Sequence, residues 1–397
     1  MTVAQPLVLL AAGGTGGHLF PAEALALRLR ERGIRVVLAT DSRVAALSGE
    51  FPASEIVAVP AATPSSGRSA LRRVTAFATL GRGFAAAVRE VRRLNPAVVV
   101  GFGGYPTVPP LLAAQMLRVP TLLHEQNAVM GRANGFLARG ASVIATGFPE
   151  VRGVPAKARA RRVHTGNPVR PAVLAAAAIP YPAVGPHSAL QLLAFGGSQG
   201  ARVMSDVVPD AVVRLDPALR ARLTVIQQAR AEDLARVQAL YEGAGLAAFA
   251  VAPFFKDLPA KMATSHLVVA RSGASTVAEL AVIGRPSILV PLPGALDQDQ
   301  AANAAVLERI GAAFPRPQTD FTPERLAGDL GALLGDPDRL AGAAAAAGAS
   351  ACPTPPSASP PWWSRPPSRP ASGPRSIRAA RERPSPQEED TQGPRLP

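Results

Sequence analysis

The 397-residue chain is poor in cysteine and in aromatic residues, and it has no long apolar run. Its single cysteine, Cys352, excludes an intramolecular disulfide and fits a reducing compartment. Aromatic residues make up only 5% of the chain, which disfavours a protein that stacks nucleic-acid bases on its surface. No apolar stretch reaches the roughly 20 residues that span a membrane. Residues 1–10 lack a basic n-region and lead directly into a glycine loop, so they predict a first strand rather than a signal peptide.

The chain does contain enough apolar residues for two cores, and it carries an uneven excess of basic charge. Its length and its 48% of apolar residues suit two domains. Residues 1–170 carry 21 Lys and Arg against 8 Asp and Glu, a net charge of +13. Residues 171–350 carry 14 against 16, a net charge of −2. The N-terminal half therefore suits an anionic partner, either nucleic acid or a membrane, although a GC-rich genome that uses arginine freely would give the same excess.

Strand-like apolar runs alternate with helical stretches along most of the chain. In the first half a run at 6–12 leads through a glycine loop into a helical pattern at 21–32 and a second run at 34–40, a βαβ unit. Further apolar runs that predict strands lie at 97–100, 119–124, 142–146, 191–195, 224–227, 267–270 and 287–290. We therefore expect an α/β protein with two Rossmann-like, doubly wound domains whose strands end at a common cleft.

Three boundaries divide this pattern. Prolines and weak periodicity place an interdomain linker at 171–188, so the domains are expected at 1–170 and 189–350. Residues 351–397 hold 13 prolines and both tryptophans, and this composition predicts a disordered tail. An alanine-rich helix at 340–351 stops abruptly before it, so we interpret the tail as the product of a frameshift; a genuine proline-rich interaction tail is the alternative.

A glycine-rich loop at 13–18 follows the first strand and opens the first helix. Backbone N–H groups of such a loop can approach a pyrophosphate, although the same loop can be a purely structural turn. Its spacing is not the dinucleotide fingerprint, and Asp41 is the nearest acidic residue for a ribose, so a nicotinamide enzyme is a remote option. A helix N-terminus would keep His18 neutral and able to act as a general base, or His18 could simply cap the helix.

Two further loops follow strands of the same expected sheet, at 103–106 and 124–127. Asn127 offers a donor and an acceptor, which suits a sugar or its acetamido group. His124 and Glu125 have side chains capable of proton transfer, and buried hydrogen-bonding roles are at least equally compatible with them.

The second half repeats the arrangement. Gly196 and Gly197 begin another possible phosphate loop, and Glu279 would lie one turn inside a helix where its carboxylate could accept both hydroxyls of a ribose, or else remain a surface charge. Asp297 and Asp299 have the Asp-x-Asp spacing of metal-dependent sugar transferases. The glutamines between and after them suit sugar hydroxyls instead, and we expect no metal.

Taken together, seven motifs resemble those of the MurG family of undecaprenyl-diphospho-muramoyl-pentapeptide N-acetylglucosaminyltransferases. They are GGTGGH at 13–18, GFGGYP at 101–106, HEQN at 124–127, TGNPVR at 165–170, GGSQGAR at 196–202, RSGASTVAE at 271–279 and DQDQAANA at 297–304. The resemblance covers residues 1 to about 345. It implies the two-domain GT-B fold, with the UDP-sugar on the C-terminal domain, the lipid acceptor on the N-terminal domain, and neither a metal nor another cofactor.

The resemblance also implies roles for individual residues. Substrate-binding positions carried over from the family are Thr15, Gly16, Gly17, Asn127, Arg170, Ser198, Phe255, Ala274, Ser275, Thr276, Glu279 and Gln300. Of these, Phe255 matches the position whose backbone recognises uracil, and Gln300 matches the glutamine that holds the sugar. His18 is the first candidate for the base and Glu125 the weaker one. The chain departs from the family at Lys256 and Asp257, where members often have two acidic residues, and in a tail without the usual terminal helix.

The implied function is an inverting transfer of N-acetylglucosamine from UDP-N-acetylglucosamine to lipid I, forming lipid II for peptidoglycan synthesis. The implied partners include anionic inner-membrane lipids and the machinery of cell-wall growth, cell shape and division, with the enzyme peripheral on the cytoplasmic face. We expect no nucleic acid. Alternatives are another UDP-sugar-dependent lipid glycosyltransferase and, more remotely, a non-catalytic nucleotide-binding protein.

The stretch 68–93 predicts a membrane-binding helix, because apolar residues alternate there with arginines. Its apolar anchors would be Leu71, Val74, Phe77, Leu80 and Phe84. An ordinary amphipathic helix that packs on the core is the alternative.

Overall fold

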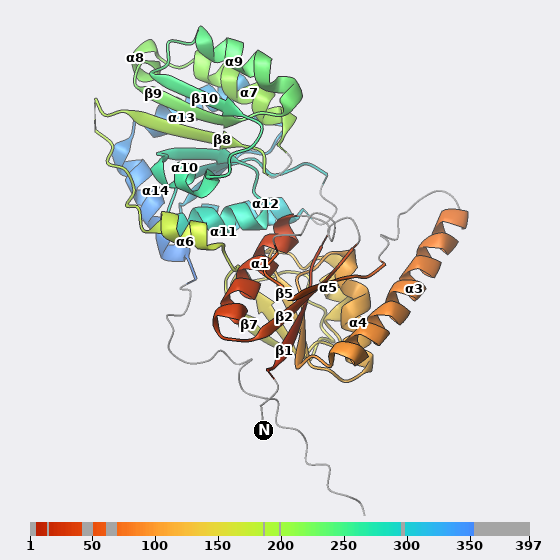
Figure 1. The fold of residues 1–397 in the computed structure, drawn as a ribbon. Helices are drawn as coiled ribbons and strands as arrows, with labels where there is room; N and C mark the ends of the chain where they lie inside the picture. Colours follow the sequence, from red (N-terminus) through yellow and green to blue (C-terminus); the bar gives the residue numbers. More distant parts are fainter. Residues whose placement is uncertain are drawn as a thin grey trace, which may run out of the picture. The chain divides into compact units, whose positions relative to one another are not determined.

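The computed structural model describes residues 5–13, 16–41, 51–60, 70–185, 187–197, 200–294 and 298–352; within this range the side chains at 70–78 and 80 are not described. Thr15, Ser198, Asp297 and residues 353–397 therefore lie outside the described residues, as do the side chains of four expected membrane anchors, Leu71, Val74, Phe77 and Leu80. The described elements form two parallel sheets within one compact unit (Figure 1).

The first sheet has seven parallel strands in the order β3-β2-β1-β4-β5-β6-β7. Its strands are β1 (Leu7–Ala11), β2 (Arg35–Thr40), β3 (Glu55–Ala58), β4 (Val98–Gly101), β5 (Thr121–Glu125), β6 (Val143–Thr146) and β7 (Arg161–His164). Its helices are α1 (Gly16–Glu31), α3 (Ala70–Leu94), the 3-10 turn η1 (Tyr105–Thr107), α4 (Val108–Met116) and α5 (Arg132–Leu137). The order reverses between β1 and β4, so the loops after these two strands meet at the switch point where such sheets bind ligands.

The second sheet has six parallel strands in the order β10-β9-β8-β11-β12-β13. Its strands are β8 (Leu190–Phe195), β9 (Leu223–Gln228), β10 (Ala248–Ala252), β11 (Leu267–Ala270), β12 (Ser287–Leu289) and β13 (Ala313–Pro315). The helices of this part are α6 (Pro171–Ala177), α7 (Arg202–Val213), α8 (Pro217–Arg220), η2 (Ala231–Asp233), α9 (Leu234–Glu242), α10 (Leu258–Thr264), α11 (Ala274–Ile283), α12 (Asp299–Arg309), α13 (Pro323–Leu334) and α14 (Pro337–Ser350). Its switch point lies between β8 and β11.

The strands predicted from apolar runs are confirmed, because those runs form the buried centres of the two sheets. Every residue of β1 and of β5 is buried. Four strands were not predicted: β3, β7, β10 and β13 lie at sheet edges, and most of their residues are exposed or half-buried. An edge strand has a neighbouring strand on one side only, so its sequence is less constrained than that of a central strand.

The sequence placed the start of the first helix wrongly, and the expected linker contains a short helix. The first helix begins at Gly16, five residues before the predicted start, and Pro21 lies inside it. The expected linker at 171–188 opens with α6, a seven-residue helix that begins at Pro171 and buries Val173 and Ala176. Proline fits the first turn of α6, where its missing N–H costs nothing. The segment between the two sheets is therefore partly packed structure.

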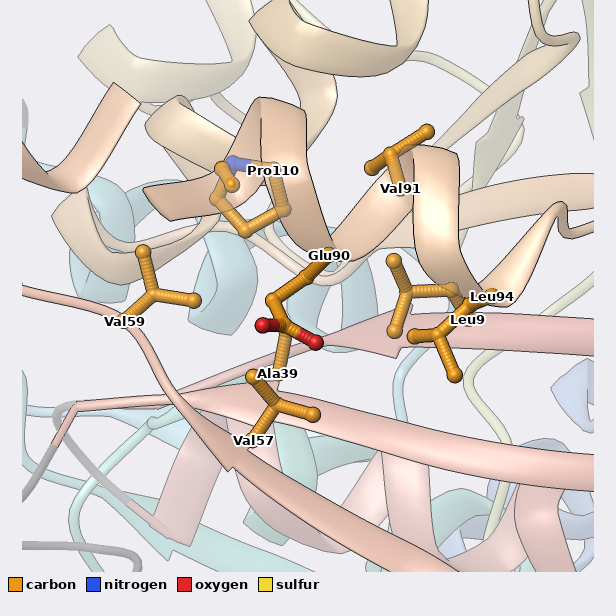
Figure 2. A pocket seen from close by; sticks show the side chains of 9 residues that line it. Leu9, Ala39, Val57, Val59, Glu90, Val91, Leu94 and Pro110 are labelled. Atoms are coloured by element: carbon orange, nitrogen blue, oxygen red, sulfur yellow. The ribbon is translucent and has the colours of Figure 1, made fainter. Parts of the chain in front are cut away.

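A small apolar cavity of about 10 Å³ lies between α3 and the first sheet (Figure 2). Leu9, Val57 and Val91 are among its walls, and Glu90 closes one side. The Glu90 carboxylate accepts a hydrogen bond from Arg93 at 2.6 Å. The volume is about that of one water molecule, and none of the motif residues lines it. We interpret it as a packing gap rather than a ligand site.

Arg285 follows the C-cap of α11, is fully buried, and holds several backbone segments together. Its guanidinium donates to the carbonyls of Ala263, Ile283, Gly284, Ile179 and Pro180. Burial lowers the pKa of Arg285 below its ordinary value.

We expect the substitution Arg285→Met to lower the free energy of unfolding by about 3 kcal/mol or more. Methionine fills similar space but leaves several carbonyls without donors, and each buried unsatisfied group costs roughly 1–3 kcal/mol. Urea denaturation followed by circular dichroism measures this change. Arg309→Met, at the exposed end of α12, is the control. Equal stability of the two variants would contradict this role.

Candidate active site

Gly103 and Gly104 bring the loop after β4 against the imidazole of His18 on α1. Both glycines have positive φ, 88° and 77°. A Cβ atom at Gly103 would lie 3.2 Å from Cε1 of His18, and one at Gly104 would lie 3.3 Å from its Cδ2. Both the backbone conformation and the close approach favour glycine. The loop after β4 therefore packs directly on the His18 ring.

His18 is held neutral by its surroundings. Burial lowers the pKa of His18 below 6.5, while a hydrogen bond to Gln126, the backbone of Phe102 and the charge of Asp299 oppose the shift. Nδ1 of His18 lies 3.3 Å from Oε1 of Gln126. A neutral imidazole in this position can accept a proton.

His124 is buried at the end of β5. Its Nε2 lies 3.0 Å from the carbonyl oxygen of Gly166, and its Nδ1 lies 3.2 Å from Nε2 of Gln126. Burial lowers the pKa of His124 to about 4, against the opposing effect of the Gly166 carbonyl. His124 is therefore neutral near pH 7 and fully engaged in hydrogen bonds within the protein.

Glu125 fixes the loop that follows β5. Its two carboxylate oxygens accept hydrogen bonds from the backbone N–H groups of Asn127 and Gly131, each at 3.0 Å. Nδ2 of Asn134 donates to the same carboxylate at 2.9 Å. Burial raises the pKa of Glu125, and these bonds oppose the shift. With both oxygens occupied, Glu125 is better placed to hold the loop than to take a proton from a substrate.

Asn303 on α12 links the loop after β5 to the second sheet. Its Oδ1 accepts from the N–H of Ala128 at 2.8 Å, and its Nδ2 donates to Oδ1 of Asn127 at 3.0 Å and to the Ser272 carbonyl at 3.1 Å. The side chain of Asn303 is fully buried. Sequence reasoning assigned no role to Asn303, although it stands inside the DQDQAANA motif.

Asn167 and Arg170 in the segment after β7 make similar connections. Nδ2 of Asn167 donates to the Gln126 carbonyl at 3.0 Å. The Arg170 guanidinium lies 3.3 Å from Oε1 of Glu279 on α11 and 4.5 Å from the centre of the Phe20 ring on α1. This cation–π contact and ion pair bring α1 and α11 to the same arginine.

Glu279 lies one turn inside α11, and its side chain is 9% exposed. Burial raises the pKa of Glu279, and the charge and hydrogen bond of Arg170 oppose the shift. Within the part of the chain that the structure describes, the second carboxylate oxygen makes no hydrogen bond. It is the oxygen left to accept hydroxyl groups from a ligand.

The N-terminus of α11 offers donors to an anion. Gly273 is its N-cap and supplies no side-chain cap, and the first turn holds no acidic residue. The hydroxyl oxygens of Ser272 and Ser275 are buried and have no hydrogen-bond partner among the described residues. Unpaired helix N–H groups and the helix dipole favour a phosphate there.

Family models match most of the chain. The glycosyltransferase family 28 N-terminal domain matches residues 8–146, and the family's C-terminal domain matches residues 191–353. The chain belongs to glycosyltransferase family 28, in its MurG branch. The predicted resemblance and the predicted GT-B fold are confirmed.

Individual relatives agree with this assignment. The chain is 83% identical over 347 residues to the UDP-N-acetylglucosamine–N-acetylmuramyl-(pentapeptide) pyrophosphoryl-undecaprenol N-acetylglucosamine transferase of Methylobacterium sp. (strain 4-46). The matched region covers 87% of this chain and 93% of the relative. The transferase of the same name from Methylobacterium nodulans is also 83% identical, over 348 residues, with the same coverage. The crystal structure of Acinetobacter baumannii MurG matches with a TM-score of 0.69 and 30% identity, over 88% of this chain and 96% of that one.

The remaining residues carried over from the MurG family lie on α1, α11 and α12 and in the segment between β10 and α10. Oε1 of Gln300 accepts from the N–H of Leu292 at 3.0 Å. Phe255 is half-buried, with the Lys261 ammonium 5.2 Å from its ring centre. Ala274 and Thr276 stand in the first turn of α11, and Gly16 and Gly17 begin α1.

Of the two aspartates in the Asp-x-Asp segment, the structure describes Asp299. Oδ1 of Asp299, the first residue of α12, accepts from the N–H of Gln300 at 2.9 Å. No group of three metal-binding side chains occurs within the described ranges. Asp297 lies outside them.

Proposed function

We propose that this chain transfers N-acetylglucosamine from UDP-N-acetylglucosamine to lipid I, the undecaprenyl pyrophosphate that carries N-acetylmuramyl-pentapeptide, and so forms lipid II for peptidoglycan synthesis. The observation that carries the proposal is 83% identity, over 93% of the relative's length, to a transferase named for this reaction. The chain is a hexosyltransferase of family 28.

The geometry supports an inverting transfer. His18 removes the proton of the acceptor hydroxyl, whose oxygen attacks the anomeric carbon of the donor sugar as the bond to UDP breaks. The free N–H groups at the start of α11 stabilise the charge that develops on the departing diphosphate. Glu279 holds the ribose, and Gln300 with Asn127 holds the sugar. The proton moves to His18 and the negative charge leaves on UDP, so the step balances.

The proposed function is tested by incubating the purified full-length chain with UDP-N-acetylglucosamine and a short-chain lipid I analogue. We expect a disaccharide product, identified by mass spectrometry, and release of one UDP for each transfer. UDP-glucose serves as the control donor and a diacylglycerol as the control acceptor. Equal transfer to the diacylglycerol would instead assign the chain to another class of lipid glycosyltransferase, and the absence of any transfer would refute the proposal.

We also propose that the enzyme works on the cytoplasmic face of the inner membrane. Among the described residues no helix is long and apolar enough to cross a membrane. The described part of α3 has side chains that face the protein and side chains that face solvent. Phe84 is half-buried and packs against the core, and Arg93 pairs with Glu55 and Glu90. Arg82 and Arg92 are exposed. Contact with the cell-wall and division machinery remains a proposal that follows from this location.

The structure adds two exposed apolar side chains, one on α4 and one on α5. Met116 at the end of α4 is 53% exposed and Phe136 on α5 is 61% exposed. Helix α4 packs against α3, and Gln115 donates to the Leu137 carbonyl at 3.0 Å, which joins α4 to α5. Arginines at 118 and 139 are exposed beside them. Apolar anchors with flanking basic residues suit an anionic membrane surface.

Flotation with vesicles tests the membrane proposal. Each basic residue near an anionic surface contributes about 1 kcal/mol, so Arg82→Gln combined with Arg92→Gln should weaken binding to anionic vesicles about 30-fold. Phe136→Ser should weaken binding further. Arg309→Gln, on α12, is the matched control and should bind as the wild type does. Equal binding of the wild type to neutral and anionic vesicles would count against the proposal.

A further inference from the structure

A chain of hydrogen bonds runs from the carbonyl of Gly166 to the ring of His18. Nε2 of His124 lies 3.0 Å from the Gly166 oxygen, and Nδ1 of His124 lies 3.2 Å from Nε2 of Gln126. Oε1 of Gln126 then lies 3.3 Å from Nδ1 of His18. The position of every proton in this chain follows from its fixed end.

The fixed end is the Gly166 carbonyl, which can only accept. Nε2 of His124 must therefore carry a hydrogen and donate it. Because His124 is buried and neutral, its Nδ1 is bare and can only accept. The group that faces this Nδ1 must be a donor, and it is the amide nitrogen of Gln126.

The orientation of the Gln126 amide is fixed a second time. Its Nε2 also donates to the carbonyl oxygen of His124 at 3.1 Å. A flipped amide would place its oxygen against that carbonyl oxygen and against the bare Nδ1, so three acceptors would face one another. The amide oxygen therefore faces His18. An amide oxygen can only accept, so Nδ1 of His18 must donate.

We propose that Gln126 and His124 are positioning residues that keep the proton of the neutral His18 ring on Nδ1, so that Nε2 keeps the lone pair that receives the acceptor's proton. The inference rests on the proposed function for the identity of that acceptor. The acceptor O–H bond breaks as an N–H bond forms at Nε2, and a bond from oxygen to the anomeric carbon replaces the bond from that carbon to UDP. The imidazolium keeps its Nδ1 hydrogen bond to Gln126 throughout.

Other groups around the His18 ring act on its charge. The Phe102 backbone and the carboxylate of Asp299 favour the charged ring, whereas burial favours the neutral one. Gly103 and Gly104 pack against the ring carbons. Among these neighbours, Gln126 is the one whose donor and acceptor ends are fixed by the rest of the chain of hydrogen bonds.

The first test reads the tautomer directly. Long-range ¹⁵N–¹H correlation spectra of the full-length protein distinguish protonated from bare ring nitrogens, and the loss of signals in His18→Asn and His124→Asn assigns them among the five histidines. We expect opposite tautomers, with the proton on Nδ1 of His18 and on Nε2 of His124. In Gln126→Met, His18 should lose this preference. A proton on Nε2 of His18 in the wild type, or an unchanged His18 signal in Gln126→Met, would overturn the inference.

The second test is kinetic. Gln126→Met should lower kcat about 10-fold or more, less than the roughly 100- to 10,000-fold expected for loss of the base itself, with UDP affinity unchanged within about twofold. Gln126→Glu places a carboxylate beside Nδ1, which should raise the pKa of His18. The pH below which kcat/KM falls, the acid limb of the pH profile, should therefore rise by about one pH unit. Gln115→Met, which removes a hydrogen bond between α4 and α5, should leave the limb in place. An unmoved limb in Gln126→Glu contradicts the inference.

Failure of the inference and failure of the proposed function give different results. A wild type that transfers no sugar to the lipid I analogue refutes the function, whatever the tautomer of His18. A wild type that transfers sugar with the proton on Nε2 of His18 refutes only the positioning role.

Discussion

Replacing His18 with alanine is expected to lower turnover by about 100- to 10,000-fold while donor affinity changes little. This is the range for losing a general base that is correctly placed. His18 meets the geometric requirement, because Gly103, Gly104 and Gln126 hold its ring at the switch point of the first sheet. Transfer rates at saturating substrates measure kcat, and titration with UDP measures donor affinity separately.

The control for this substitution is His164→Ala, an exposed histidine on β7, which should keep normal turnover. The pH dependence provides a second check. Because burial lowers the pKa of His18 below 6.5, the ring is neutral at pH 7, and kcat/KM should fall only as the pH drops below 6.5 through that lowered pKa. Near-normal turnover in His18→Ala would show that His18 only packs the loop and that the base lies elsewhere.

The sequence predicted the central strands of both sheets because their signal is local and strong. Buried parallel strands such as β1 and β11 are short, continuous apolar runs, and the glycine turns that follow them are equally visible. The parts that sequence reasoning missed depend on partners far along the chain. Asn303 bonds to residues about 175 positions away, and the five carbonyls that Arg285 contacts come from three separate segments. No local pattern distinguishes these two residues from surface polar residues.

The same limit applies within the candidate site. The HEQN motif predicted that four polar residues would follow β5, but it left open which of them faces a ligand. The structure separates them by their hydrogen bonds. His124 and Glu125 are occupied by backbone and amide groups of the protein, whereas His18 on α1 keeps one ring nitrogen outside the chain of bonds that starts at Gly166. Which ring nitrogen of His18 carries the proton depends on this three-dimensional network, so the sequence alone does not determine it.

Replacing Glu279 with alanine is expected to weaken UDP binding about 10- to 1000-fold. Hydrogen bonds to a charged group are worth roughly 1.5–3 kcal/mol each, and a carboxylate can accept both hydroxyls of a ribose. The upper part of that sum is not expected, because one oxygen already pairs with Arg170 at 3.3 Å in the free protein and must share that partner with the ligand. Isothermal titration with UDP measures the dissociation constant.

Three comparisons separate a ribose contact from a general loss of charge. Glu242→Ala, on the exposed face of α9, should leave UDP binding unchanged. Arg170→Met tests whether the ion pair itself matters. 2′-Deoxy-UDP provides the most specific check. It should bind the wild type more weakly than UDP does, whereas Glu279→Ala should bind the two ligands equally.

The pH dependence of UDP binding gives a further check. Because burial raises the pKa of Glu279, the wild type should lose UDP affinity on acidification at a higher pH than a site with an ordinary carboxylate would, and Glu279→Ala should show no such loss. A dissociation constant that is the same in Glu279→Ala and in the wild type would remove Glu279 from the donor site.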